Sequence, residues 1–306
     1  MQEEPAAGPD VKELGGGGGW AWGIAVPAVA CIAAFGALYA PVFARLAKWW
    51  WNDGNYSHGF LVPVISGVFV YSRRKELSRL MLRPSALGWA ATAAGIMGYF
   101  VGVAAGVFYV QALSVLVVLG GAALALGGWR ALGFFAFAIL YLALMIPLPG
   151  GIYQALTFKL QLLATRASAA VLDLAGAPVY ADANVIRFAG GKSLAIAEAC
   201  SGLRSILGLT ATSLAFVYFL REEPIWERAV LVASTLGIAI LANVFRIAGT
   251  GLLYQYVSPQ AAEGFFHGLS GWLVFVLALF VLLVEYRVLR ALFIVEEEPG
   301  EGGEGA

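Results

Sequence analysis

The chain has 306 residues, of which 60% are hydrophobic and only 12% are charged, and its formal net charge is zero. Such a composition excludes an ordinary soluble protein and indicates an integral membrane protein that contacts the lipid bilayer. Because the chain has no excess of basic residues, we expect no nucleic-acid partner. Two cysteines, Cys31 and Cys200, are too few for a disulfide framework or a thiolate metal cage.

The two ends of the chain read as cytoplasmic tails. Residues 1–19 carry acids, prolines and the run Gly15 to Gly19, which cannot bury enough apolar surface to fold. Residues 291–306 are acidic and get the same interpretation. The first apolar segment lacks a basic stretch before it and a clear cleavage site, so we expect a retained anchor. Residues 20–290 are then one transmembrane domain.

About eight segments of this domain are apolar enough to be membrane helices across a core of about 30 Å. The predicted spans are 20–43, 59–71, 86–106, 110–128, 131–146, 203–220, 229–254 and 266–286. The second is short, but Ser57 and His58 extend it into the membrane interface. The predicted fold class is therefore an all-α polytopic membrane protein.

The orientation follows from the basic loops, because short loops rich in Lys and Arg stay in the cytoplasm. Placing the loop from Arg73 to Arg83 inside puts both termini in the cytoplasm, with 11 basic residues inside and six outside. The cell membrane is the expected location.

The segment 152–176 is long enough to cross the membrane as a ninth span, which would move Cys200 to the cytoplasmic side. However, Lys159, Arg166 and Asp173 recur every seven residues and draw a polar stripe along one helical face. A crossing would also export the arginines of the last loops. We therefore expect an interfacial helix on the outer face.

Between residues 178 and 197 the hydrophobic pattern changes to a period of two. The segments 185–188 and 193–196 flank Gly190 and Gly191, a pair suited to a tight turn with positive φ. We expect a small β-hairpin on the outer face that leads to Cys200 at the start of the sixth span.

Cys200 is the first candidate for chemistry. At a predicted helix N-terminus, the helix dipole favours a thiolate, and Arg204, four residues on, shares the predicted helical face. The alternative is that Cys200 is a small apolar residue and that Arg204 anchors a helix end.

Arg246 lies seventeen residues beyond Ala229, about 25 Å along the helix, near the outer boundary of the core. An ionisable residue within a span costs roughly 2.5 to 3.5 kcal/mol by insertion scales and usually faces a cavity or the bundle interior. Asn243 lies three residues earlier and steers the guanidinium or lines the site in this hypothesis. A snorkelling arginine is the alternative.

The two histidines also fall on the predicted outer side. His267 starts the eighth span, with Glu263 one turn earlier, and an imidazole titrates near pH 6.5, about right for proton transfer. His58 is a candidate to support the substrate, although interfacial packing explains it equally well. Neither histidine belongs to a paired zinc-ligand spacing, and no cofactor fingerprint is evident, so we expect no metal and no cofactor.

These residues lie in segments that resemble the exosortase/archaeosortase family of membrane cysteine enzymes. The segments are Ser57-His58-Gly59 with Pro63, Glu198-Ala199-Cys200-Ser201-Gly202-Leu203-Arg204-Ser205, Asn243-Val244-Phe245-Arg246 and His267-Gly268. The cysteine segment is the specific one. The resemblance covers most of the chain.

The resemblance implies a protein-sorting transpeptidase, and the orientation predicted from the basic loops puts its active site on the outer side of the membrane. Its substrates would be membrane-anchored proteins with a C-terminal tail of a short motif such as Pro-Glu-Pro, a helix and a basic cluster. The resemblance assigns Cys200 as nucleophile, Arg246 as essential arginine and His267 as the histidine of the triad. In this reading Arg204, Asn243, Glu198 and His58 support the site or bind substrate.

Two points stay open at this level. The first is the acyl acceptor, which is either water or an amine of the cell envelope. The second is the role of Arg246, which either stabilises an oxyanion, holds the cysteine as a thiolate or binds a substrate carboxylate. Two other functions also account for the membrane charges: a small-molecule permease that uses Arg246 as an anion site, and a noncatalytic factor for exopolysaccharide assembly.

Overall fold

The computed structural model describes residues 17–189, 191–196, 202–221, 223–258, 260 and 265–293, with side chains from residue 26 to 260 in those ranges and from 275 to 293. The chain divides into two units, Met1–Arg45 and Leu46–Ala306. The helix α1 (Gly17–Asn52) supplies all of the described part of the first unit and continues into the second. The tails 1–16 and 294–306 lie outside the described residues.

The second unit begins with helices from the first half of the chain. They are the 3₁₀ helix η1 (Gly54–Phe60), α2 (Leu61–Ser72), the short α3 (Arg74–Leu77), α4 (Ala86–Ala104), α5 (Phe108–Tyr141) and the 3₁₀ helix η2 (Leu142–Met145). Helices α4 and α5 pack through glycines, because a Cβ atom on Gly121 would lie 2.5 Å from the backbone nitrogen of Thr92. Small residues of this kind let membrane helices approach closely.

Helix α5 is interrupted at Gly128, whose φ of 73° places it in the left-handed region. A Cβ atom there would lie 2.1 Å from the carbonyl oxygen of Arg83, so only glycine fits beside this loop. The break falls at the predicted boundary between the spans 110–128 and 131–146, so one continuous element holds two helical segments.

In the second half of the chain, the described residues form three long helices, one further apolar helix and a small sheet. They are α6 (Gly150–Leu174), β1 (Val179–Asp182), β2 (Val185–Phe188), β3 (Ser193–Ala195), α7 (Leu203–Phe219), α8 (Ile225–Tyr256) and α10 (Phe265–Phe293). The predicted hairpin is confirmed as β2 and β3, with Gly191 at φ 83°. The sequence reading missed β1, which makes the sheet three-stranded and antiparallel in the order β1-β2-β3.

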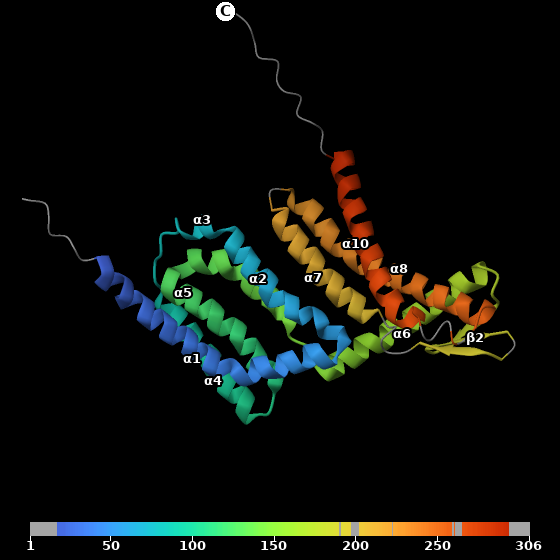
Figure 1. Cartoon of the computed structure of the whole chain (residues 1–306), viewed down its shortest axis with the longest axis horizontal. Helices are drawn as coiled ribbons and strands as arrows, with labels where there is room; N and C mark the ends of the chain where they lie inside the picture. Colours follow the sequence, from blue (N-terminus) through green and yellow to red (C-terminus); the bar gives the residue numbers. More distant parts are fainter. Residues whose placement is uncertain are drawn as a thin grey trace, which may run out of the picture. The chain divides into compact units, whose positions relative to one another are not determined.

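Two hydrophobic clusters organise these elements along α8 (Figure 1). In the first half of α8, Ala239 packs with Leu209 of α7 and Ala278 of α10. In its last turns, Ile247 and Ala248 pack with α6 and the inner face of the sheet. The helix therefore joins an apolar three-helix packing to a separate core formed with α6 and the strands, which we call the α6–sheet module.

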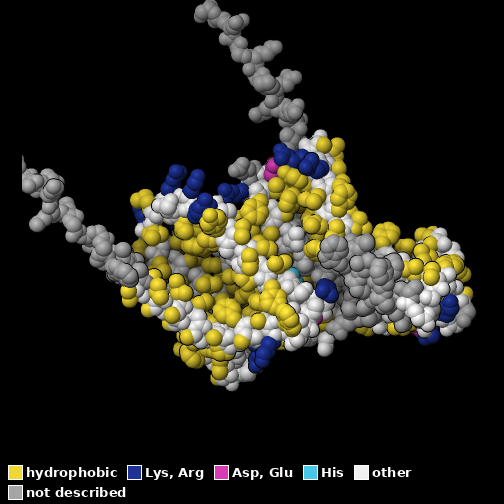
Figure 2. Space-filling view, viewed as in Figure 1, with side chains coloured by type: hydrophobic (Ala, Val, Ile, Leu, Met, Phe, Trp, Pro, Cys, Tyr) yellow, Lys and Arg dark blue, Asp and Glu magenta, His cyan; other side chains and the backbone are white. Residues whose placement is uncertain are grey.

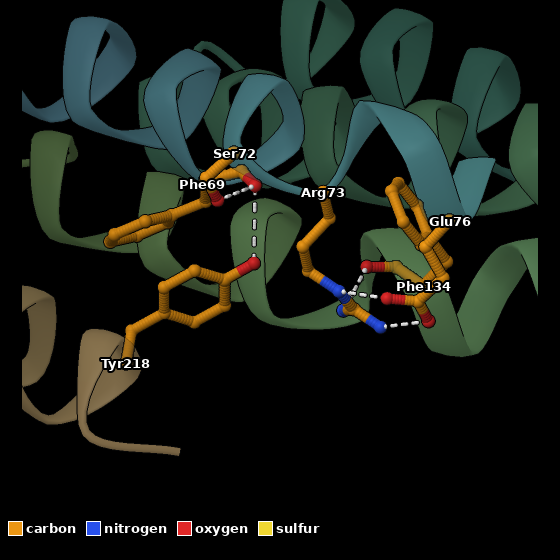
Figure 3. Close-up of polar contacts among 6 residues, drawn as sticks. All are labelled: Phe69, Ser72, Arg73, Glu76, Phe134 and Tyr218. Atoms are coloured by element: carbon orange, nitrogen blue, oxygen red, sulfur yellow. Dashed lines mark hydrogen bonds and ion pairs between the residues drawn. The ribbon is translucent and has the colours of Figure 1, made fainter. Parts of the chain in front are cut away.

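A polar cluster ties α2, α5 and α7 together (Figure 3). Arg73 pairs with Glu76, and its guanidinium carbon lies 4.6 Å from the centre of the Phe134 ring. The hydroxyl of Tyr218 donates to the carbonyl oxygen of Phe69 at 3.1 Å. These contacts link the ends of helices that are far apart in sequence.

Within the residues that the structure describes, four helices are long and apolar enough to cross a membrane: Val26–Asn52, Ala86–Ala104, Phe108–Met145 with its kink, and Ile225–Tyr256. Figure 2 shows hydrophobic side chains along the helices of this face. A group of Lys and Arg side chains lies at the upper edge, near α3 and the C-terminal end of α10, and a few others lie near the centre, at the lower edge and near the sheet. This pattern is typical of membrane helices with basic ends. The chain is thus largely helical and suited to the membrane, while the number of eight crossings, the orientation and the interfacial place of α6 stay predictions.

Candidate functional site

The helix η1 is held by polar contacts to elements that follow α5. Its N-cap residue, Asp53, accepts a hydrogen bond from the backbone nitrogen of Asn55 at 2.9 Å. The side-chain amide of Asn55 donates to the hydroxyl of Tyr153 on α6 at 2.8 Å. The backbone nitrogen of Leu148 donates to the hydroxyl of Tyr56 at 3.2 Å. The first contact closes the N-terminus of η1, and the other two hold η1 against the start of α6 and the residues just before it.

His58 belongs to this fixed segment. Its Nε2 atom lies 3.3 Å from the carbonyl oxygen of Leu144 on η2. Burial lowers the pKa of His58 below its ordinary value of 6.5, and the positive charge of Arg204 acts in the same direction, while backbone hydrogen bonds oppose the shift. The imidazole is therefore neutral near pH 7, and its Nε2–H group donates a hydrogen bond to the carbonyl oxygen of Leu144, which can only accept.

Arg204 reaches η1 from the first turn of α7. A Cβ atom on Gly54 would lie 2.8 Å from a terminal nitrogen of the Arg204 guanidinium, so this group packs directly on the Gly54 backbone. The N-cap of α7 is Gly202, with φ 85° in the left-handed region, and the helix begins at Leu203. The prediction that Cys200 and Arg204 share one helical face is therefore wrong, because Gly202 interrupts the helical backbone between them.

The start of α7 packs against α8 at Asn243. A Cβ atom on Gly202 would lie 3.0 Å from Nδ2 of Asn243, whose side chain is buried. Arg246 is partly buried on the next turn of α8. It follows Ile225, the first residue of the helix, by 21 positions, or about 31 Å, which is one thickness of the hydrocarbon core.

His267 lies in the first turn of α10, although its side chain is outside the described ones. Helices α8 and α10 are antiparallel, because Ser234 donates to Glu285 at 2.6 Å while Ala239 packs with Ala278. If this register continues, residue 267 lies within about two helical turns of Arg246 along α8.

Cys200 and Glu198 lie outside the described residues, but the chain on either side of them is described. The last described residue before them is Ile196, and the first after them is Gly202. The backbone nitrogen of Ile196 donates to the carbonyl oxygen of Asn184 at 2.8 Å. The five-residue segment 197–201 thus runs between the sheet and the Asn243 contact.

Sequence reasoning missed Gln161, which contacts Ile196, the last described residue before this segment. Its side chain is buried and donates from Nε2 to the carbonyl oxygen of Ile196 at 3.2 Å. Thr165 and Ser168 continue a polar line on this buried face of α6, and Ser168 donates to the carbonyl oxygen of Val244 on α8 at 3.2 Å. The spacing of Gln161, Thr165 and Ser168 was a usable signal, since it marks one helical face opposite the charged stripe.

The candidate site residues that the structure describes lie on three neighbouring elements, η1, the start of α7 and α8. His58 and Gly54 belong to η1, Arg204 and Gly202 to the start of α7, and Asn243 to α8. Among the side chains that the structure describes, no group of three or more His, Cys, Asp or Glu residues is arranged to hold a metal ion.

The helices define a helical membrane protein, and the candidate site residues that the structure describes lie where η1, α7 and α8 meet. A family model described as transmembrane exosortase matches residues 50–284. The chain therefore belongs to the transmembrane exosortase family, which confirms the resemblance seen in its motifs. Comparisons with the curated proteins and with the solved structures give no match.

Proposed function

We propose that this protein is a membrane-embedded cysteine protease or transpeptidase that cleaves the C-terminal sorting tail of exported proteins. Family membership across residues 50–284 supports this class of activity. The observation that carries the assignment of the site is the packing of Gly202 on Asn243, one helical turn before Arg246. Because Gly202 follows Cys200 by two residues, this contact supports a position of Cys200 near the face of α8 that carries Arg246.

In the proposed reaction, the Cys200 thiolate adds to the scissile carbonyl carbon and forms a tetrahedral intermediate. The intermediate collapses to a thioester as the C–N bond breaks, and His267 supplies the proton that the leaving amine takes up. Water or an amine of the cell envelope then attacks the thioester carbonyl carbon and gives its proton to the neutral His267. The C–S bond breaks, which restores the Cys200 thiolate and the protonated His267 with which the cycle began. No redox step or cofactor is needed for this balance.

Arg246 has three candidate roles, namely oxyanion stabilisation, stabilisation of the thiolate and binding of a substrate carboxylate. For the first role, one well-placed donor is commonly worth about 2.7 to 4 kcal/mol in the transition state. The partly buried position of Arg246 suits each role, because a guanidinium in a less polar environment interacts more strongly with an anion.

The place of the site along α8 supports a substrate that is itself anchored in the membrane. Arg246 lies about one core thickness from the start of α8, so a cleavage point just outside a substrate helix would lie at the same depth. A PEP-CTERM-like tail, with a Pro-Glu-Pro motif, a helix and a basic cluster, is the proposed substrate, and the outer face of the cell membrane is the proposed side.

The test uses the full-length protein produced together with a secreted reporter that carries such a tail. We expect Cys200→Ala and Cys200→Ser to leave the reporter at full length in the membrane. Arg246→Ala and His267→Ala should also lose processing, while membrane fractions show normal amounts of each variant. Normal processing by the Cys200 variants would exclude covalent thiol catalysis, and loss of the Arg246 or His267 variants from the membrane would instead indicate a structural role.

A further inference from the structure

The strand β3 forms one edge of the three-stranded sheet and leads into the segment that contains Cys200. Among the residues that the structure describes, its one partner strand is β2, in the order β1-β2-β3. Its last residue, Ala195, precedes Cys200 by five positions. An open strand edge next to a candidate nucleophile is a place where an extended peptide can bind.

The hydrogen-bond pattern shows which backbone groups of this edge point outward. The carbonyl oxygen of Lys192 accepts from the backbone nitrogen of Phe188 at 2.9 Å, and the backbone nitrogen of Ile196 donates to Asn184 at 2.8 Å. In an antiparallel ladder the direction alternates along the strand, so residues 192, 194 and 196 face β2. The N–H and C=O groups of Ser193 and Ala195 therefore point away from the sheet.

These outward groups have no hydrogen-bond partner within the part of the chain that the structure describes. Ser193 and Ala195 are both exposed. Residues i and i+2 of an extended strand are about 6.6 to 6.8 Å apart. The N–H and C=O groups of Ser193 and Ala195 therefore have the spacing needed to pair with alternate residues of one added strand. Backbone groups in this arrangement are satisfied together by an extended polypeptide rather than by a small solute.

The opposite edge of the sheet is a poorer candidate. The strand β1 follows α6 directly through Gly176 and packs beside that helix, as Figure 1 shows for the sheet as a whole. The edge formed by β3 is the one that continues into the candidate site.

We propose that the polypeptide substrate binds to the open edge of β3 as an added β-strand, paired with the backbone of Ser193 and Ala195. The proposal rests on the proposed function, because it names how the substrate of that site is held. The pairing carries the substrate backbone along β3 toward the segment 197–201. Affinity comes from main-chain hydrogen bonds, so this edge recognises an extended conformation more than particular side chains.

Proline substitutions in the enzyme test this pairing, because proline lacks the N–H group. Ala195→Pro removes an outward donor and leaves the bonds between β2 and β3 intact, a position that edge strands tolerate. We expect kcat/KM for the Pro-Glu-Pro reporter to fall about tenfold through a higher KM, since a lost hydrogen bond is worth on the order of 1 kcal/mol or somewhat more. Leu194→Pro is the matched control, because it breaks the ladder with β2 and should lower thermal stability.

A second measurement leaves the enzyme unchanged and scans the reporter. Each of five consecutive residues beside the motif is replaced by proline in turn, and the processing rate is measured in membranes that contain the wild-type enzyme. We expect strong losses at alternate positions, because only alternate residues of an added strand donate to the edge. Normal KM in a stably folded Ala195→Pro variant, or losses without alternation, would overturn the proposal.

The outcomes separate this proposal from the proposed function. If the wild-type enzyme does not process the reporter, or if Cys200→Ala processes it, the proposed function fails. If processing depends on Cys200 but is indifferent to Ala195→Pro and to the position of proline in the reporter, the function stands and the β3 edge is not the binding surface.

Discussion

His58 shows how a single residue of the site is set by its surroundings. Its imidazole lies against the carbonyl oxygen of Leu144 and near the cationic Arg204. Burial is the larger cause of its lowered pKa, and the arginine adds to it. The folded protein therefore resists protonation at this residue, while the unfolded chain accepts a proton near pH 6.5.

This difference predicts a loss of stability in mild acid. Above about pH 6.5 both states hold a neutral His58, so the residue adds no pH dependence there. As the pH falls below that value, the unfolded state binds the proton first, and stability decreases until the pH reaches the lower pKa of the folded state. The midpoint of thermal unfolding of the purified protein in detergent, measured from pH 7.5 to 5, checks this.

The variant His58→Gln is the control for this measurement. A glutamine amide also donates a hydrogen bond but does not titrate, so its unfolding midpoint should change less between pH 6.5 and 5. His267 is present in both proteins and cancels in the comparison. Equal pH dependence of the two proteins would show that His58 is not the titrating group.

At the scale of elements, α6 has two different faces. Its charged residues Lys159, Arg166 and Asp173 are exposed, as the seven-residue spacing indicated. Its other face buries Gln161 and Ser168, each of which donates to a backbone carbonyl of another element. The helix therefore acts as a support for the sheet and for α8, whatever its place relative to the membrane.

The bond from Gln161 to Ile196 predicts a role for Gln161 as a positioning residue. Gln161→Leu leaves the carbonyl oxygen of Ile196 buried without its donor, at a cost of about 1 to 3 kcal/mol. If the bond also orients the segment 197–201, the kcat for reporter processing should fall several-fold. The rate at which a small neutral alkylating reagent modifies Cys200 should change as well.

Ser168→Ala is the matched control on the same helix. It removes a bond to Val244 of α8 and should lower the unfolding midpoint by a similar amount without changing the rate of alkylation. An equal alkylation rate in Gln161→Leu and the wild-type protein would leave Gln161 with a purely structural role.

On the scale of the whole molecule, α8 connects the apolar helices to the α6–sheet module. Its 32 residues extend about 48 Å, which exceeds a hydrocarbon core of about 30 Å. If the core begins near Ile225, the last turns beyond Arg246 project out of it, where they pack with α6 and the sheet. One rigid helix then sets the depth of the site.

The orientation of the molecule predicts which side of the membrane each region faces. Single cysteines at the exposed Tyr180 of the sheet and the exposed Lys75 of α3 serve as reporters, in a chain whose own two cysteines are replaced by serine. We expect Tyr180→Cys to react with a membrane-impermeant maleimide from outside. Lys75→Cys should react only after the membrane is permeabilised, since the basic loop stays in the cytoplasm.

The reverse labelling pattern would place the sheet and the neighbouring segment 197–201 in the cytoplasm. It would mean that α6 crosses the membrane as a ninth span. The proposed cleavage of exported tails on the outer face would then be wrong, while membership of the family would stand.

The sequence alone determined the features that depend on local pattern. Apolar runs located the helices, alternation located β2 and β3, and a glycine at the end of the run 110–128 marked the break in α5. The motifs around Cys200, Asn243 and Arg246 led to the family that the match confirms. The strand β1 was missed because its residues are mostly exposed and so leave no alternating apolar signal.

Only the tertiary structure decided how these local features meet. The contacts between Arg204 and Gly54, between Gly202 and Asn243, and between Gln161 and Ile196 join residues 35 or more positions apart. Such contacts depend on how whole helices pack, and the local sequence around one residue does not reveal which distant residue it contacts. For the same reason, the left-handed Gly202 that ends the helical register before Arg204 became visible only in the folded chain.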